Sequence, residues 1–355
     1  MRAMGSEYME WAKLSSNARY SLATSGVGPF PLTQLPVDFS QLEINGPNSY
    51  GYVPLLEAIA AKSGVDSDCV VTAAGASMAN YLAMGALLEP GDDVLIERPG
   101  YELLIAAASH IGANIVRFDR LADEGFAIDV DAIRRAITPR TRLIVLTNLH
   151  NPSSVYTPPA VLTAVGELGV PVLVDEVYLD ALYEDAPPSA FHLGPQFVVT
   201  NSLTKMYGAS GLRCGWVLAP PELAKRMWRL NDVMGSVAPY ITEHISHTAL
   251  KNLPQLRDRA RAVLDADRAE LHVFLGRCCA IEAVDAPYGT TCFPRLLRGS
   301  VDRLLDELRA QETSVVPGRF FDAPNRFRIG MGVDHTMFVE GLRRLESVLN
   351  GLVYS

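Results

Sequence analysis

One stretch of the sequence decides the fold class by running from a strand pattern through a helix pattern to a second strand pattern. Residues 143–178 read LIVLTNLHNPSSVYTPPAVLTAVGELGVPVLVDEVY. Leu143 to Thr147 and Val170 to Val174 are continuous apolar runs, which are typical of parallel strands buried on both faces. Pro159 to Leu168, between them, has the pattern of a helix that begins with proline. The order strand, helix, strand predicts a parallel sheet covered by helices.

The same alternation extends along the chain from about residue 69 to residue 220. It predicts five more strands at Cys69 to Ala73, Asp93 to Glu97, Asn114 to Phe118, Phe197 to Thr200 and Cys214 to Leu218. The predicted helices between them are Met78 to Leu88, Glu102 to Ile111 and Val130 to Ile137. We therefore expect an α/β fold with a mostly parallel seven-stranded sheet and helices on both faces.

A different pattern follows the predicted sheet. Residues 221–277 read as long helices, and residues 281–327 mix short strands with a helix at 301–310, which is typical of a smaller α+β domain. A chain of 355 residues also exceeds one hydrophobic core. We expect residues 1–40 to form an N-terminal arm that contributes to the small domain, 41–250 the large domain, and 251–355 the small C-terminal domain.

Composition narrows the classes of partner. The formal net charge of −9 disfavours binding to the phosphate backbone of nucleic acid, which needs an excess of Lys and Arg. No apolar run is long enough to span a bilayer, and the N-terminus lacks a signal-peptide pattern. The five cysteines are scattered without the spacing of a metal site. We expect a cytoplasmic protein that binds no metal, nucleic acid or membrane.

Polar residues follow the predicted strands at their carboxyl ends, where open α/β sheets bind ligands. After the strand that ends at Ala73 come Gly75, Ala76 and Ser77, at the start of a helix. Free backbone amides and a hydroxyl at such a position favour an anion such as phosphate. Tyr101 follows the next strand and places an aromatic ring at the same edge, where a flat ligand can stack.

The later strand ends supply the remaining groups. Asn151 follows one strand, and Asp175 and Tyr178 follow the next. The last strand of the series is followed by Ser202, Lys205 and Arg213. An anion, an aromatic plane, a basic ring nitrogen, a phenolic oxygen and an aldehyde would each find a partner among these residues. One cofactor carries all five of these groups.

The residues around the lysine carry a resemblance to a known family. Residues 201–216 read NSLTKMYGASGLRCGW, and VDEVY at 174–178 and Asn151-Pro152 are further matches, as are GYVPLLEAIA at 51–60 and Phe327 to Gly330. These motifs resemble the class I/II aminotransferases of the fold-type I pyridoxal-phosphate enzymes. The resemblance implies pyridoxal 5′-phosphate as cofactor, held by Lys205 as a Schiff base.

The resemblance also implies a role for each polar residue in catalysis. Lys205 forms the imine and then carries the proton from the substrate α-carbon. Asp175 keeps the pyridine nitrogen protonated, so that the ring accepts electrons from the carbanion. Asn151 and Tyr178 hydrogen-bond the phenolic oxygen. Lys205, Asp175 and Tyr178 are therefore the expected catalytic residues.

Binding roles follow from the same resemblance. The phosphate is assigned to Gly75, Ala76, Ser77, Ser202 and Arg213, and the ring stacks on Tyr101. We expect Arg213 to be buried, with its charge compensated by the phosphate. Arg328 resembles the arginine that clamps the substrate carboxylate together with Asn151. Arg326 would point to the same face of a strand, so spacing alone leaves both arginines open.

The expected reaction moves the α-amino group of an amino acid to a 2-oxo acid through a Lys205 Schiff base and a pyridoxamine phosphate intermediate. Elimination at the β- or γ-carbon, decarboxylation, ring closure and oxidation stay open, because these reactions use the same cofactor residues. A regulator domain or a dinucleotide-dependent dehydrogenase fits less well. Residues 1–40 show no helix-turn-helix pattern, and no Gly-x-Gly-x-x-Gly follows the first strand.

Three features depart from the family or leave its details open. The usual Asn-Pro-Thr-Gly reads Asn151-Pro-Ser-Ser154 here, which is expected to alter the turn. Residues 231–240 resemble the segment that reaches the neighbouring subunit, so we expect a homodimer. Arg319 is the one candidate for a dicarboxylate side chain near the site, and a solvated loop position is the expectation for it. The side chain of the substrate therefore stays open.

Overall fold

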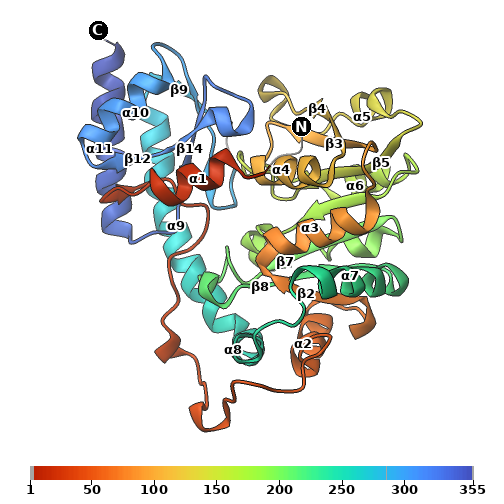
Figure 1. The fold of residues 1–355 in the computed structure, drawn as a ribbon. Helices are drawn as coiled ribbons and strands as arrows, with labels where there is room; N and C mark the ends of the chain where they lie inside the picture. Colours follow the sequence, from red (N-terminus) through yellow and green to blue (C-terminus); the bar gives the residue numbers. More distant parts are fainter. Residues whose placement is uncertain (1–3, 285, 354–355) are drawn as a thin grey trace.

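A seven-stranded sheet is the largest feature of the computed structural model, which describes residues 4–284 and 286–353. The strand order is β2-β8-β7-β6-β5-β3-β4, and only β8 runs antiparallel to its neighbours (Figure 1). The strands are β2 (Val70–Ala74), β3 (Asp93–Arg98), β4 (Asn114–Asp119), β5 (Thr141–Thr147), β6 (Val172–Asp175), β7 (Phe197–Ser202) and β8 (Cys214–Leu218). The predicted sheet is confirmed.

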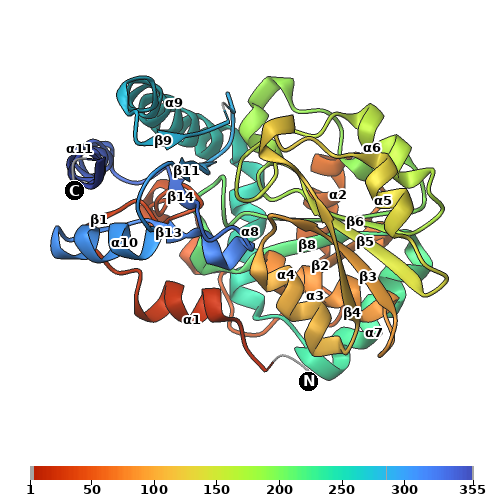
Figure 2. The ribbon, with the colours of Figure 1, turned by 90° about the horizontal axis from the view of Figure 1, so that it is seen from above.

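Both faces of this sheet are buried under helices (Figure 2). Along β5, Ile144 and Leu146 enter one hydrophobic core, and Leu143 and Val145 enter the other. One face carries α3 (Gly75–Leu87), α4 (Glu102–Ile111) and α7 (Pro221–Met234), and the other carries α2 (Val53–Ser63), α5 (Val130–Ala136) and α6 (Pro159–Gly166). This is why the strands read as continuous apolar runs in the sequence.

Helix α3 begins three residues earlier than its predicted start at Met78. Gly75 has a φ of +81°, which lets the chain turn directly from β2 into the helix without a connecting loop. Gly75, Ala76 and Ser77 therefore form the first turn of α3, where backbone amides have no partner within the helix. The predicted anion-binding position is therefore the first turn of the helix itself.

The remainder of the chain forms a second, smaller lobe, which we define as residues 278–353. It is reached through α8 (Tyr240–Lys251) and α9 (Leu253–Arg277) and contains a three-stranded sheet in the order β10-β14-β13. Its elements are β9 (Ile281–Glu282), β10 (Thr291–Cys292), β11 (Arg295–Leu296), α10 (Val301–Ala310), β12 (Thr313–Ser314), β13 (Val316–Pro317), β14 (Phe327–Gly330) and α11 (His335–Val353). The α+β character is confirmed, whereas the domain limits at residues 40 and 250 stay a prediction.

The N-terminal arm, defined here as residues 4–38, contains a helix that the sequence pattern did not predict. Helix α1 (Glu7–Leu14) lies between the small lobe and α4 (Figures 1 and 2). Ser6 caps the helix by accepting the Met9 N–H at 3.1 Å and donates its hydroxyl proton to Glu102 of α4. Strand β1 (Tyr20–Ser21) then pairs in parallel with β12. The arm thus contacts both lobes, through α4 of the large lobe and β12 of the small lobe.

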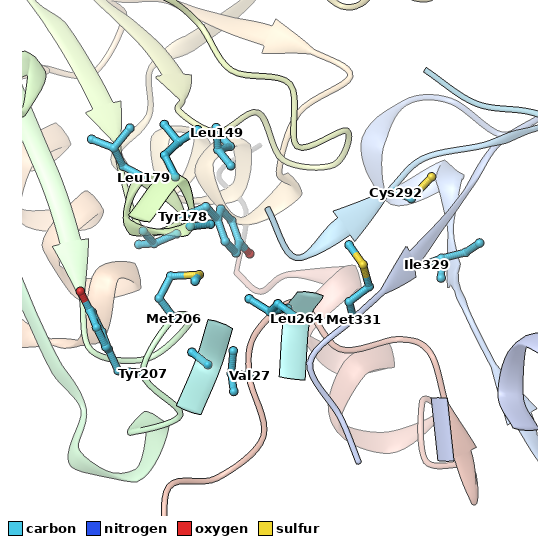
Figure 3. Close-up of a cluster of buried hydrophobic side chains, with 14 of the residues drawn as sticks. Val27, Leu149, Tyr178, Leu179, Met206, Tyr207, Leu264, Cys292, Ile329 and Met331 are labelled. Atoms are coloured by element: carbon cyan, nitrogen blue, oxygen red, sulfur yellow. The ribbon is translucent and has the colours of Figure 1, made fainter. Parts of the chain in front are cut away.

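A hydrophobic cluster fills the junction between the arm and the two lobes (Figure 3). Tyr178 and Met206 enter it from loops of the large sheet, Leu264 from α9, Met331 from the small lobe and Val27 from the arm. Burial of these side chains stabilises one arrangement of the three parts. In residues 4–284 and 286–353, no helix combines the length and the apolar character needed to cross a membrane.

Candidate active site

A cleft of about 420 Å³ lies where strands β5, β6 and β7 end. This volume is in the range of small-molecule sites. Its lining includes nine residues that the sequence predicted: Ala76, Ser77, Tyr101, Asn151, Asp175, Tyr178, Ser202, Lys205 and Arg213. Gly75 and Arg328 lie directly behind this lining, in contact with Arg213 and Asn151 respectively. The structure therefore brings all the predicted site residues together.

The floor of the cleft is a buried carboxyl group. Asp175 is the last residue of β6 and is only 4% exposed. Its Oδ2 accepts a hydrogen bond from Asn80 Nδ2 at 2.8 Å, and Asn80 Oδ1 accepts one from Thr200 Oγ1 at 2.7 Å. Burial raises the pKa of Asp175 to about 6, although Asn80, the Val177 amide and the charge of Lys205 oppose the rise. A cationic partner would restore the carboxylate.

Asn80 is a site residue that the sequence analysis missed. It lies on the buried face of α3, among Ala79, Leu82 and Ala83. A polar side chain on an otherwise apolar helix face must find a buried partner. That signal was present in the sequence, but only the position of β6 shows that Asp175 is the partner.

Lys205 lies in the loop after β7 and is half-buried. Its Nζ donates a hydrogen bond to Ser25 Oγ at 2.8 Å. Its backbone oxygen accepts the Val27 N–H, also at 2.8 Å. The amine therefore lies within the cleft and not in bulk solvent, and the N-terminal arm holds it there.

One end of the cleft is suited to an anion. The amides in the first turn of α3 have no carbonyl partner within the helix. Arg213 Nη2 lies 3.0 Å from the Ala74 carbonyl oxygen, to which it donates. A Cβ on Gly75 would collide with the Arg213 guanidinium, and a Cβ on Gly215 would collide with the backbone of residues 75 and 76. The expectation that Arg213 is buried is wrong. It follows η7 (Ser210–Leu212) at the rim of the cleft, where its side chain is exposed.

The opposite end contains a fully buried guanidinium. Arg328 on β14 is 0% exposed, and its Nη1 donates to Asn151 Oδ1 at 3.0 Å. Its Nε makes no hydrogen bond to any of the described residues. Arg326 lies just before β14 and turns away, because its Nη1 donates to the Phe293 carbonyl oxygen and its guanidinium covers the Phe126 ring. The structure thus chooses Arg328 over Arg326 as the arginine at the cleft.

Tyr8, on α1, is a second residue that the sequence analysis missed. Arg328 Nη2 donates to its hydroxyl at 3.0 Å, and its ring packs edge-on against Tyr101 with centroids 5.5 Å apart. Burial raises the pKa of Tyr8, but the charges of Arg328 and Lys205 and the Arg328 hydrogen bond lower it below its ordinary value. The available signal was Ser6 with acidic residues in the following turn, a helix-start pattern.

The loop that carries Asn151 is fixed by a buried network. The Asn151 N–H donates to Thr147 Oγ1 at 2.8 Å, and Thr147 Oγ1 donates to Glu97 Oε1 at 2.6 Å. Glu97 Oε2 in turn accepts from Arg120 Nη1 at 2.8 Å, and both side chains are fully buried. Burial raises the pKa of Glu97, whereas Arg120 and Thr147 oppose the rise. The network therefore orients Asn151 toward Arg328.

The turn after Asn151 keeps a glycine-like shape without the glycine. Ser154 has a φ of +63°, in the left-handed region that side chains rarely adopt. Its hydroxyl lies 2.9 Å from Thr291 Oγ1 and accepts the Thr291 N–H at 3.2 Å. Ser154 therefore adopts the conformation that glycine favours and ties the turn to β10 of the small lobe.

The remaining predicted residues complete the walls. Tyr101 precedes α4 and is packed against Tyr8, while Tyr178 is buried at the end of the floor. Ser202 Oγ accepts the Thr204 N–H at 3.2 Å, and Thr204 Oγ1 is buried without a partner among the described residues. Arg319 is half-exposed, 3.6 Å from Asp302, as expected for a solvated loop residue.

The comparisons with known proteins agree with this geometry. Residues 39–345 match the profile of the family described as Aminotransferase class I and II, and the chain belongs to this family. It is 30% identical over 301 residues to the arginine–pyruvate transaminase AruH of Pseudomonas aeruginosa, covering 79% of this chain and 75% of that protein. It is 29% identical over 360 residues to the capreomycidine synthase of Streptomyces vinaceus, covering 94% of this chain and 90% of that protein.

A solved structure shows the same fold over nearly the whole chain. The crystal structure of the PLP-dependent cyclase OrfR superposes with a TM-score of 0.86 at 25% sequence identity. The superposition covers 99% of this chain and 98% of the cyclase. The seven-stranded sheet and the smaller lobe are therefore those of the fold-type I pyridoxal-phosphate enzymes.

The cofactor of this chain is pyridoxal 5′-phosphate, and the cleft fits it. The first turn of α3 and the Arg213 guanidinium form a corner for a phosphate. A protonated pyridine nitrogen beside the buried Asp175 carboxyl would lower its raised pKa and favour the carboxylate. Thr204 Oγ1 and Arg328 Nε are buried polar atoms at the cleft that have no described partner. The donor set therefore suits an anionic, nitrogen-containing ring.

Proposed function

We propose that this protein transfers the α-amino group of an amino acid to a 2-oxo acid, using pyridoxal phosphate held on Lys205. One observation carries the proposal: the Lys205 amine, the Asp175 carboxyl and the Arg328–Asn151 pair all meet at a single cleft. An amine, an acidic floor and a carboxylate clamp are the three groups that an α-amino acid needs. The family match supports the same reaction class.

Different side chains of the cleft carry out different steps of this reaction. Pyridoxal phosphate, when bound, supplies an aldehyde that captures the amino group and a ring that takes up the electrons of the broken Cα–H bond. The Lys205 amine accepts the Cα proton and returns it at the next stage. Asp175, in its carboxylate form, keeps a proton on the ring nitrogen. Tyr178 and Asn151 donate hydrogen bonds at the ring oxygen.

The two ends of the cleft orient the reactants. Arg328 and Asn151 hold the substrate carboxylate, and Arg328 Nε, which has no hydrogen-bond partner among the described residues, is available as a further donor. Tyr101 supplies the wall on which the ring stacks. The phosphate is held by Gly75, Ala76, Ser77, Ser202 and Arg213.

The direct test is to mix the holoprotein with a panel of amino acids in the absence of any 2-oxo acid. A transaminase converts one equivalent of amino acid and stops with its cofactor in the pyridoxamine 5′-phosphate form. The visible spectrum measures the cofactor, and chromatography measures the 2-oxo acid. Continuous release of ammonia, carbon dioxide or an eliminated side chain would overturn the proposal.

Ring closure is the second candidate, and a specific observation favours it. The similarity to capreomycidine synthase covers 94% of the chain, and a cyclase shares the fold. A cyclase and a transaminase use the same floor, because both begin by breaking the Cα–H bond. In the same panel, a cyclase would form a cyclic amino acid over many turnovers and leave the cofactor in its starting form.

We also propose that the protein is a cytoplasmic homodimer. Apolar side chains are exposed on and beside the segment between α7 and α8, near Arg213: Val233, Met234, Val237 and Ile241. Contiguous exposed apolar surface is typical of an interface. All five cysteines are free thiols, which fits a reducing compartment. Sedimentation of the holoprotein as a monomer would refute the dimer, and recovery in a membrane or secreted fraction would refute the location.

A further inference from the structure

A hydroxyl group from the N-terminal arm contacts the amine on which the proposed function depends. Ser25 Oγ accepts a hydrogen bond from Lys205 Nζ at 2.8 Å, and Ser25 is only 7% exposed. The backbone oxygen of Ser25 accepts the Thr290 hydroxyl proton at 3.0 Å. The small lobe thus fixes Ser25 in place.

The contact is supported on both sides by the backbone. The Val27 N–H donates to the Lys205 carbonyl oxygen at 2.8 Å. A Cβ on Gly26 would lie 2.8 Å from that oxygen and 3.0 Å from Lys205 Cα, so only glycine allows the arm to approach this closely. Val27 is anchored beside Leu264 in the cluster at the junction of the lobes (Figure 3). Ser25 is therefore held by a rigid segment.

An uncharged hydroxyl is suited to an amine that changes its protonation state. A neutral amine that donates one N–H to Ser25 keeps its lone pair for another group. Once the amine has accepted a proton, the resulting ammonium still donates to the same oxygen. A carboxylate in this position would favour the ammonium form strongly, whereas a hydroxyl accepts from both forms.

We propose that Ser25 holds the free amine of Lys205 in position, so that the nitrogen lone pair faces the Cα–H bond of the substrate. This role rests on the proposed function, in which Lys205 carries the Cα proton. Ser25 touches the nitrogen that reacts, and it has this role whenever the amine is not bonded to the cofactor. It serves every reaction that starts with Cα–H cleavage, including ring closure.

The kinetic test compares holoproteins that carry Ser25→Ala and Ser25→Thr. Single turnovers with Cα-deuterated and ordinary amino acid measure the proton transfer, and exchange of the Cα proton with D₂O measures the same step without requiring a complete reaction. Ser25→Ala is expected to slow both by about tenfold and to enlarge the isotope effect, with unchanged substrate affinity. Ser25→Thr retains the hydroxyl and is expected to recover most of the rate.

Thr33→Ala is the control, because Thr33 lies on the same arm but is exposed, in the short helix η1 (Leu32–Gln34), and does not line the cleft. It is expected to react at the wild-type rate. Equal rates for wild type and Ser25→Ala would overturn the proposal. A Thr33→Ala protein that slows as much as Ser25→Ala would also overturn it, because the loss would then reflect the arm in general.

A crystal structure gives a readout that does not depend on turnover. In the wild-type protein loaded with pyridoxamine 5′-phosphate, Lys205 Nζ is expected within hydrogen-bonding distance of Ser25 Oγ, and an amine that points elsewhere would overturn the role. Cα exchange without formation of the pyridoxamine form would refute transamination and leave the Ser25 measurements valid. A wild-type protein that exchanges the Cα proton of no amino acid would overturn both.

Discussion

The floor and the roof of the cleft are built in different ways. The floor is Asp175, Lys205 and the first turn of α3, which lie at the carboxyl ends of β6, β7 and β2 in one sheet. The roof is Tyr8, Ser25 and Arg328, and the contact between Tyr8 and Arg328 joins residues 320 positions apart. In the proposed function, the floor binds a cofactor that many enzymes share, whereas the roof lies on the substrate side of the cleft. Local sequence motifs are therefore enough to identify the cofactor. The choice of substrate depends on contacts between distant parts of the chain.

The largest expected effect tests the floor. Lys205→Ala removes the amine that carries the Cα proton, so the rate of amino-acid conversion is expected to fall by about 10⁴-fold or more. The loss is measured by single-turnover spectroscopy with the amino acid that the panel identifies. Lys251→Ala, at the exposed end of α8, is the control and is expected to retain activity. Substantial turnover by Lys205→Ala would contradict the role of Lys205 in the floor, and with it the comparison between floor and roof.

The second prediction concerns the buried acid of the floor. Asp175→Asn keeps the shape but loses the charge that holds a proton on the ring nitrogen, so turnover is expected to fall by about 10²-fold. Steady-state kinetics of the holoprotein measure the change. A smaller loss than that caused by a roof substitution would contradict the division between floor and roof.

The same variant changes the pH dependence of the apoprotein. Because the pKa of Asp175 is raised from 3.8 to about 6, the folded apoprotein holds a proton over this pH range that the unfolded chain releases. The free energy of unfolding is therefore expected to fall, by on the order of 3 kcal/mol, as the pH rises through this range. In Asp175→Asn, the decrease in unfolding free energy that is due to Asp175 should be absent. The decrease due to Glu176 should remain, because burial raises the pKa of Glu176 to about 7.

Chemical denaturation of the two apoproteins across this pH range measures the difference. Identical pH profiles would show that Asp175 is solvated in the absence of the cofactor. The carboxyl group would then ionise over this pH range without a cationic partner.

A smaller effect sharpens the description of the roof. Tyr8→Phe removes the hydroxyl that accepts from Arg328 and helps to orient its guanidinium, so an amino acid is expected to bind about tenfold more weakly. The amine that lacks the α-carboxylate serves as the comparison ligand and should bind wild type and variant equally. Titration of the cofactor spectrum measures both affinities. Tighter binding by Tyr8→Phe would instead show that the phenol competes with the substrate.

The smallest expected effect concerns the link between floor and roof. Thr147→Val keeps the shape but leaves the Asn151 N–H without its acceptor, so KM is expected to rise about threefold and stability to fall by about 2 kcal/mol. Thr157→Val, on the far side of the buried ion pair, removes an acceptor of Arg120 and is the control. It should lose similar stability with an unchanged KM. Equal changes in KM would show that the network supports only the fold.

The sequence predicted the sheet well because its evidence is local. A strand buried on both faces needs apolar residues at every position, so the runs at 143–147 and 214–218 could be placed within two residues. The start of α3 was misplaced because Gly75 makes the turn without a loop. Spacing alone could not separate Arg326 from Arg328, because the strand begins only at Phe327, whereas the family resemblance selected Arg328.

The roof could not be predicted from the sequence because its evidence is distant. Helix α1 has eight residues, which is too short to be stable alone, and its packing against α4 and the small lobe holds it in place. Tyr8 and Ser25 look like ordinary residues of a Gly- and Pro-rich arm until the fold places them beside Arg328 and Lys205. The sequence analysis wrongly predicted that Arg213 is buried for the same reason, because the exposure of its side chain depends on where the cleft opens.

The docking of α1 has a practical consequence for anyone who purifies the protein. Ser6 bonds to Glu102 of α4, and Tyr8 and Met9 of α1 line the cleft, so an affinity tag attached ahead of α1 would lie close to the cleft. The end of α11 lies on a different side of the molecule (Figure 1). A tag placed there leaves the cleft clear, and assays of amino-acid specificity are best made with that arrangement.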